Sequence, residues 1–177
     1  ERRFKYISIY NGKKNIGPQK SFLFLANKTC TEYFFFCDQD DVWHPNKIKS
    51  HLHYLNKNEL VISDSSILDV KNTKISLLKY RNINLTMKRN VVNALIKPYV
   101  PGHSMSGHSK ILKSYKHKNC RTLDKFHYDS FLFIYSLINY KVYFIEQKLT
   151  QYRIHENNTI GLGNYSIFLK LNKNELL

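Results

Sequence analysis

Apolar runs of strand length alternate along the chain with longer segments in which apolar residues recur at helical spacing. The runs Phe4–Tyr10, Tyr33–Cys37 and Leu60–Ser63 each predict a strand. Tyr33–Cys37 is continuous and aromatic, which is typical of a buried strand near the centre of a sheet. Two later runs, Val142–Ile145 and Leu149–Arg153, predict two further strands.

Helices are expected between these strands. Pro18 suits the first turn of a helix that runs through SFLFLANK, and Pro45 opens a second helix, NKIKSHLHYLNK. In the second helix Ile48, Leu52 and Leu55 fall on one face, which we expect to be buried. Strands that alternate with helices predict an α/β layered fold.

The remaining segments are less regular. Helices are expected at residues 91–96 and 109–115, and a buried helix, apolar nearly all round, at 130–140. The polar residues 71–90 predict a long connection or a weak helix, and residues 98–107 predict a loop that can hold a strand. Neither a repeat nor a linker divides the sequence, so we expect one domain across all 177 residues.

Charge narrows the classes of partner. Lys and Arg number 28 against 13 acidic residues, a net charge of +15, which favours nucleic acid, a phospholipid surface or nucleotide diphosphates. The basic stretch 110–125 is most simply a solvated face, and a lipid-docking surface is the alternative.

The cysteines show no CxxC spacing, which indicates reduced thiols in a cytoplasmic protein. We expect Cys37 to be a small core residue. No apolar run is long enough to span a bilayer, which leaves a peripheral contact with the inner face of a membrane open.

The stretch FFFCDQDDVW places Asp38, Asp40 and Asp41 directly after the predicted central strand. Carboxylates this close repel one another, and ligands of open α/β sheets sit at the carboxyl ends of strands. Oxygen ligands at i and i+2 can hold Mg²⁺ or Mn²⁺, which removes the repulsion and leaves room for substrate phosphates. The alternative is a turn in which one carboxylate, such as Asp41, caps the helix near Pro45. Because a cap needs only one of the three, we favour the metal hypothesis.

Four segments, in order, resemble a known family. NIGPQKSFLFLANKTCTEYFFFCDQDDVWHPNKI is similar to the middle of bacterial family 2 glycosyltransferases of the GT-A fold, especially rhamnosyltransferase-like members that build cell-surface polysaccharide. LVISDSSILD resembles the strand that follows, and PGHSMSG, with Gly102 as a candidate substrate contact, resembles the acceptor-side loop. FHYDSFLFIYSLINYKVYFIEQKLTQYRIHENNTIG resembles the catalytic helix and the closing Tyr-Arg-x-His-x-x-Asn segment. The resemblance runs from Asn15 to Gly161, and DQDDVW and YRxHxxN are its specific parts.

The resemblance implies an inverting, metal-dependent hexosyl transfer from a nucleotide-diphosphate sugar to a saccharide or lipid-linked saccharide, on a Rossmann-like mixed sheet flanked by helices. Asp38 and Asp40 would be the DxD pair that binds Mg²⁺ or Mn²⁺ across the donor diphosphate. His155 would be a further contact to the metal or the diphosphate. Asp129 would take the proton from the acceptor hydroxyl in a single displacement. Arg153 would brace the phosphates or orient Asp129.

From the residues alone, these positions have simpler interpretations. Asp129 precedes an apolar helix and could be its N-cap, and His155 could be a solvated loop histidine. Trp43 could pack in the core or form a wall of the sugar pocket. Asn15 and Gly17 would form a turn first and contact the nucleotide second.

The chain also departs from the family pattern. His103 and residues 106–108 replace small, apolar or Asn-like residues, which leaves the acceptor open, and Tyr128 separates a His and an Asp that are adjacent in the family. Asp64 is expected to end a strand, with a place near the donor sugar as the alternative. The first strand and the turn that recognises the nucleotide base are expected before Phe4. We therefore expect an N-terminally incomplete fold, either a fragment or an inactive homologue.

Two other functions are alternatives to the transferase. A nucleic-acid-binding module suits the charge and the aromatic content, but the sequence contains no RNP1-like segment, zinc-finger spacing or GxxG loop on a basic face. A metal-dependent phosphoesterase would need more His and acidic ligands near strand ends. His51 and His53 lie two residues apart on a predicted helix and cannot share a face. We therefore expect a nucleotide-sugar donor and no nucleic-acid partner.

Overall fold

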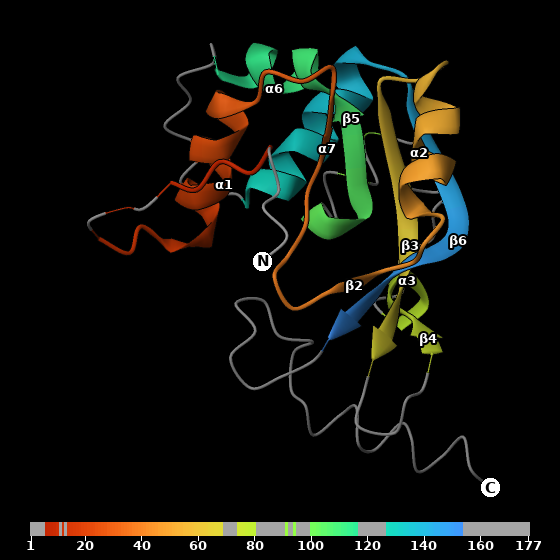
Figure 1. The fold of residues 1–177 in the computed structure, drawn as a ribbon. Helices are drawn as coiled ribbons and strands as arrows, with labels where there is room; N and C mark the ends of the chain where they lie inside the picture. Colours follow the sequence, from red (N-terminus) through yellow and green to blue (C-terminus); the bar gives the residue numbers. More distant parts are fainter. Residues whose placement is uncertain are drawn as a thin grey trace, which may run out of the picture.

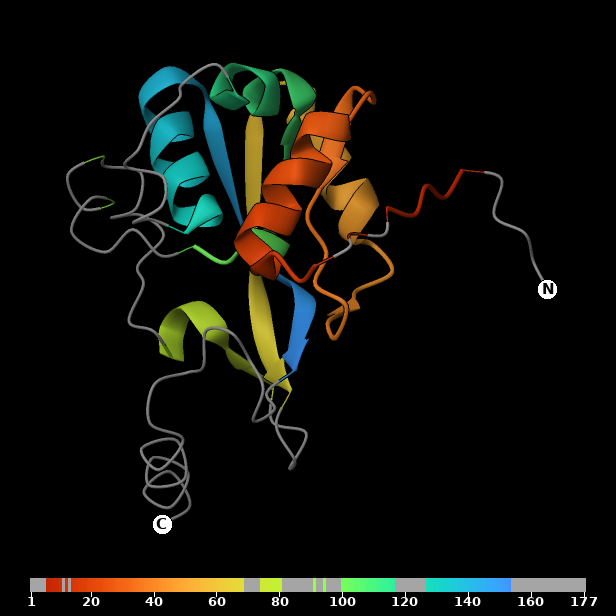
Figure 2. The same ribbon diagram turned by 90° about the vertical axis from the view of Figure 1, so that its left-hand side faces the viewer.

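One mixed sheet with helices on both faces forms the part of the chain that the computed structural model describes (Figures 1 and 2). The described residues are 6–10, 12, 14–68, 74–80, 91, 94, 100–116 and 127–153. The strand order is β1-β5-β3-β6-β2, and β4 pairs with β3 beside this path. The strands are β1 (Tyr33–Phe35), β2 (Val42–Trp43), β3 (Leu60–Leu68), β4 (Lys74–Ser76), β5 (Met105–His108) and β6 (Val142–Arg153).

The central strand of this sheet is β3. It pairs in parallel with β6 and antiparallel with β5. Because successive side chains of a strand point to opposite faces, Leu60 and Ile62 enter one hydrophobic core and Val61 enters another. The pairing with β6 changes register on both sides of Asp64, so the strand is irregular where its sequence turns polar.

Each of the two cores is covered by its own helices. The helices are α1 (Gly17–Lys28), α2 (Lys47–Leu55), α3 (Leu77–Tyr80), α6 (Ser109–Lys116) and α7 (Tyr128–Asn139), with a short 3-10 helix η1 (Gly102–Ser104). Helices α1, α6 and α7 pack on one face of the sheet, and α2 packs on the other (Figure 2). None of the described helices is long and apolar enough to cross a membrane.

Several predicted strands have different bounds or places in the structure. The prediction for Phe4–Tyr10 is wrong over its described part, because residues 6–10 are exposed and lie in no strand. A lone strand has no ladder partners to stabilise it. The run Tyr33–Cys37 yields only the three-residue β1, which lies at an edge of the described sheet and not at its centre. Cys37 is exposed and its thiol faces the Asp38 carbonyl, so its prediction as a core residue is also wrong.

Two other strands are longer than predicted. The run Leu60–Ser63 continues to Leu68, so Asp64 lies inside β3 and does not end it. Asp64 accepts hydrogen bonds from Ser76 Oγ at 2.6 Å and from the backbone N–H of Leu78 at 3.3 Å. It therefore ties β3 to β4 and α3. The two predicted strands near the C-terminal end of the described chain form the single strand β6.

The helices agree better with their predictions. Pro18 lies in the first turn of α1, where Gly17 has φ +79°. The predicted helix at 109–115 is confirmed as α6, and that at 130–140 as α7. The latter is not buried all round, because Ile138 is 61% exposed. Residues 71–90 and 91–96 are described only in part, and those parts contain β4, α3 and two helical residues.

The buried face of α2 differs from the predicted apolar face. Ile48 is exposed, whereas Lys47, His51 and Leu55 are buried. These three residues recur every four positions, so they share one face of the helix. Polar side chains can occupy it because each has a partner: Lys47 Nζ donates to the His103 carbonyl, and His51 Nδ1 lies 2.6 Å from Ser106 Oγ.

We predict that His51 makes the protein acid-sensitive. Burial, with a smaller effect from the charge of Lys47, lowers the pKa of His51 from 6.5 to about 3. Between these values the unfolded chain binds a proton that the folded chain does not, so stability falls as the pH falls from 6.5 towards 3, by up to ~1.4 kcal/mol per pH unit. Urea unfolding at several pH values should show that the free energy of unfolding depends less on pH in His51→Gln than in the parent protein. The matched control is His53→Gln, an exposed position on the same helix. Equal slopes in the two variants would contradict the assignment.

Candidate active site

The 3-10 helix η1 contacts acidic side chains on two sides, Asp129 on one and the pair Asp38 and Asp41 on the other. It follows Pro101, whose carbonyl accepts hydrogen bonds from the backbone N–H and the hydroxyl of Ser104, at 3.0 and 2.6 Å. Its first residue, Gly102, donates its backbone N–H to Asp129 Oδ2 at 3.2 Å. A Cβ at Gly102 would overlap the Tyr128 hydroxyl. Any other residue here would have to displace the Tyr128 ring, so glycine permits this close approach of η1 to α7.

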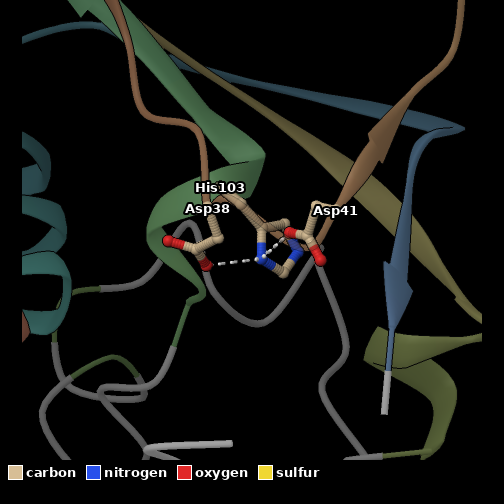
Figure 3. A group of neighbouring side chains, drawn as sticks. All are labelled: Asp38, Asp41 and His103. Carbon is tan, nitrogen blue, oxygen red and sulfur yellow. Dashed lines mark ion pairs between the residues drawn. The ribbon is translucent and has the colours of Figure 1, made fainter. Parts of the chain in front are cut away.

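The second residue of η1, His103, faces the acidic loop after β1 (Figure 3). Its Nδ1 lies 3.0 Å from Asp41 Oδ2 and 3.5 Å from Asp38 Oδ2. One ligand atom from each of the three residues lies within 4.8 Å of the others. The other oxygen of Asp41 accepts a hydrogen bond from the backbone N–H of Arg153 at 3.3 Å, so β6 fixes the position of this carboxylate.

The His103 side chain is almost completely buried and is held on several sides. Ser65 Oγ of β3 lies 2.9 Å from its Nε2, and the ring of Tyr152 stacks on it at 5.2 Å between centroids. Burial alone would lower the pKa of His103, but the carboxylates of Asp38 and Asp41 beside its Nδ1 outweigh this effect and raise the pKa. The two carboxylates thus stabilise the protonated imidazole relative to that of a free histidine.

Lys47 supports the same segment from α2. Its Nζ donates to the His103 carbonyl at 2.6 Å and to Thr150 Oγ1 at 2.5 Å, and lies 4.7 Å from the centroid of the Trp43 ring. Burial lowers the pKa of Lys47 to about 8, although Asp41 and other nearby acidic groups oppose the shift. A buried cation beside the acidic loop thus adds to the positive charge that balances it.

Asp129 lies in the first turn of α7 and is buried. Its Oδ1 accepts the backbone N–H of Ser130 at 2.7 Å, whereas Oδ2 accepts that of Gly102. The residue at the N-cap position is His127, so Asp129 does not occupy it. Burial raises the pKa of Asp129, against the lowering effects of these N–H groups and of His127. A carboxylate that burial makes more basic is suited to accept a proton.

The other predicted site residues take different positions. Asp40 is half-buried and is not in the group of three potential metal ligands, and Arg153 contributes a backbone N–H to Asp41. Asn15 Oδ1 accepts the Gly17 N–H at 2.8 Å, which is the turn expected at the start of α1. Trp43 packs against Lys47 and, with centroids 5.9 Å apart, against the ring of Phe35. The segment that contains His155 lies outside the described residues.

Sequence reasoning missed the contributions of His103, Lys47 and Asp41. In the sequence, His103 is only a departure from the family pattern, and Lys47 is only one residue of a predicted helix. Asp41 was considered as a helix cap, but the N-cap of α2 is Asn46, and no side chain caps it. The available signal was a run of three acids in a chain with few acids, which indicates that nearby cations balance them.

The residues of this site fit a divalent cation. Two carboxylates and an imidazole are suitable ligands for such ions. Asp41 Oδ2 is buried and receives no hydrogen bond of acceptable geometry, although Nδ1 of His103 is near. A buried carboxylate oxygen without a hydrogen bond is costly, and a bound cation would satisfy it.

Comparison with known proteins identifies the family and the fold. The model of the family described as "Glycosyl transferase family 2" matches residues 2–119. Among solved structures, residues 1–349 of S. aureus TarS, crystallised with UDP-GlcNAc, share the fold with a TM-score of 0.58 and 13% sequence identity. The match covers 80% of this chain and 40% of that chain. A comparison with curated proteins finds no significant match. The fold is thus that of GT-A glycosyltransferases, and the chain belongs to glycosyl transferase family 2.

Proposed function

We propose that this chain catalyses inverting transfer of a hexosyl group from a nucleotide-diphosphate sugar to a saccharide or lipid-linked saccharide in cell-surface polysaccharide synthesis. The observation that carries the proposal is the position of η1. Gly102 contacts the candidate base Asp129, and the adjacent His103 contacts Asp38 and Asp41. A donor diphosphate held at the acidic loop would therefore lie close to the group that activates the acceptor.

Donor binding is proposed for the loop after β1. Asp38 would hold Mg²⁺ or Mn²⁺ with other oxygen ligands of the loop, and the family pattern favours Asp40 and His155 as its partners. When bound, the cation would offset the charge that develops on the departing diphosphate. Trp43, Asn15, Gly17 and Arg153 remain proposed donor contacts. The TarS structure was solved with UDP-GlcNAc, which supports a nucleotide-sugar donor for this chain.

Acceptor activation is proposed for Asp129. Its carboxylate would take the proton of the acceptor hydroxyl while that oxygen attacks the anomeric carbon and the bond to the diphosphate breaks. Attack opposite the leaving group inverts the anomeric configuration. The N–H groups of Gly102 and Ser130 would hold the carboxylate in place during the transfer. Gly102 would also face the substrate.

A lipid-linked acceptor would bring the chain to the membrane surface, with the basic segment 110–125 as its proposed contact.

We predict metal-dependent binding of a nucleoside diphosphate. Calorimetric titration with UDP, GDP and dTDP should show binding of at least one that requires Mn²⁺ or Mg²⁺. Asp38→Asn should weaken it by roughly tenfold or more, because one negative ligand is lost. Glu146→Gln, which removes the same charge from an exposed site on β6, should bind like the parent. If binding needs no metal ion, is unchanged in Asp38→Asn and weakens steeply as the salt concentration rises, the protein would instead be a nucleic-acid-binding protein.

We also predict that Asp129→Asn lowers kcat by roughly 10²- to 10⁴-fold while donor binding persists, because the amide cannot accept the proton. The measurement is the rate of sugar transfer by the protein. In the parent, the rate should rise with pH through the raised pKa of Asp129, since only the ionised carboxyl is a base. Asp129→Asn should lack this rise. Unchanged turnover in the variant would show that another group is the base.

A further inference from the structure

We propose that His103 is a direct ligand of the cation together with Asp38 and Asp41, and that its ring nitrogen makes the site prefer Mn²⁺ to Mg²⁺. The inference rests on the proposed function, in which this loop holds the cation of the donor. It differs from the family pattern, which would place Asp40 and His155 in these roles. The ligands follow from the described geometry, and the preferred metal follows from the chemistry of those ligands.

The first argument is the direction of the three side chains. Asp38 and Asp41 approach the same ring nitrogen of His103 from the loop after β1 (Figure 3). The Asp41 side chain has no exposed surface, and its Oδ2 receives no hydrogen bond although Nδ1 is 3.0 Å away. One ligand atom from each of the three residues lies within 4.8 Å of the others, so the atoms are close enough to bind a common ion.

The second argument is the way in which His103 is fixed. A metal-binding histidine typically uses its other ring nitrogen in a hydrogen bond that sets the tautomer. Here Ser65 Oγ lies 2.9 Å from Nε2, which leaves the Nδ1 lone pair free to face Asp38 and Asp41 when Nε2 carries the proton. Tyr152 stacks on the ring, and Lys47 Nζ donates to the His103 carbonyl. The ring is therefore oriented before any ion arrives.

The third argument concerns the choice of metal. Mg²⁺ is a hard cation that prefers oxygen ligands and keeps several waters, whereas a transition-metal ion accepts an imidazole nitrogen more readily. Two carboxylates and one imidazole make such a mixed set. Among the two cations expected for the family, Mn²⁺ is the better match, with donor phosphates completing its shell.

The test is pulsed electron paramagnetic resonance of Mn²⁺ added to the protein without nucleotide. Bound Mn²⁺ should show coupling to a ¹⁴N nucleus in the parent, in His155→Gln and in His44→Gln, an exposed histidine beside the acidic loop. His103→Gln should lose the coupling, bind Mn²⁺ roughly tenfold or more weakly, and lose its preference for Mn²⁺ over Mg²⁺ in competition. Ser65→Ala should keep the coupling but bind Mn²⁺ roughly tenfold more weakly, because the ring is no longer held.

Several results would overturn the proposal. Coupling that persists in His103→Gln, coupling that vanishes in His155→Gln, or a parent protein that binds no Mn²⁺ would each do so. If His103→Gln does not fold, Ser65→Ala serves as the test. An unchanged affinity of Ser65→Ala for Mn²⁺ would then contradict the assignment of His103 as a metal ligand. Nucleotide binding is measured separately. A protein that binds Mn²⁺ through His103 but no nucleoside diphosphate would refute the proposed function and leave this inference standing.

Discussion

The candidate site depends on two consecutive residues of η1. The backbone N–H of Gly102 binds Asp129, and the side chain of His103 lies against Asp38 and Asp41. The Cα atoms of adjacent residues are only about 3.8 Å apart. The two contacts made by Gly102 and His103 therefore hold α7 close to the acidic loop. The absence of a side chain at Gly102 is what allows η1 to approach Tyr128 so closely.

The elements around η1 hold it through buried polar contacts. Lys47 of α2 binds the His103 carbonyl, Ser65 of β3 binds the ring, and Tyr152 of β6 stacks on it. Burying an ammonium group is costly unless it is hydrogen-bonded and opposed by nearby negative charge. Lys47 is hydrogen-bonded to Thr150 and lies near the negative charge of Asp41. The acidic loop and the buried cations therefore stabilise one another, and removing either would leave the other unbalanced.

The GT-A fold positions the strands and helices, whereas the side chains of the site determine which reaction the protein can catalyse. Similarity to TarS at 13% identity establishes the arrangement of sheet and helices, but a shared fold does not fix a donor or an acceptor. The features that bear on function are local to this chain. They are a buried carboxylate on α7, two carboxylates after β1, and an unusual histidine between them.

The sequence by itself determined the family, the α/β class, most helices and the acidic loop, because these are written in local periodicity and short motifs. It also indicated Asp38 and Asp129 as candidate residues. Local pattern could not reveal that α2 buries Lys47 and His51 and exposes Ile48, because that choice depends on partners 55 or 56 residues away. It likewise could not place β1 at the edge of the described sheet. Only the tertiary structure brought His103 to Asp41, because β5, which directly follows η1, pairs antiparallel with β1 and so places η1 beside the loop after β1. Nothing in the spacing of the two residues encodes this contact.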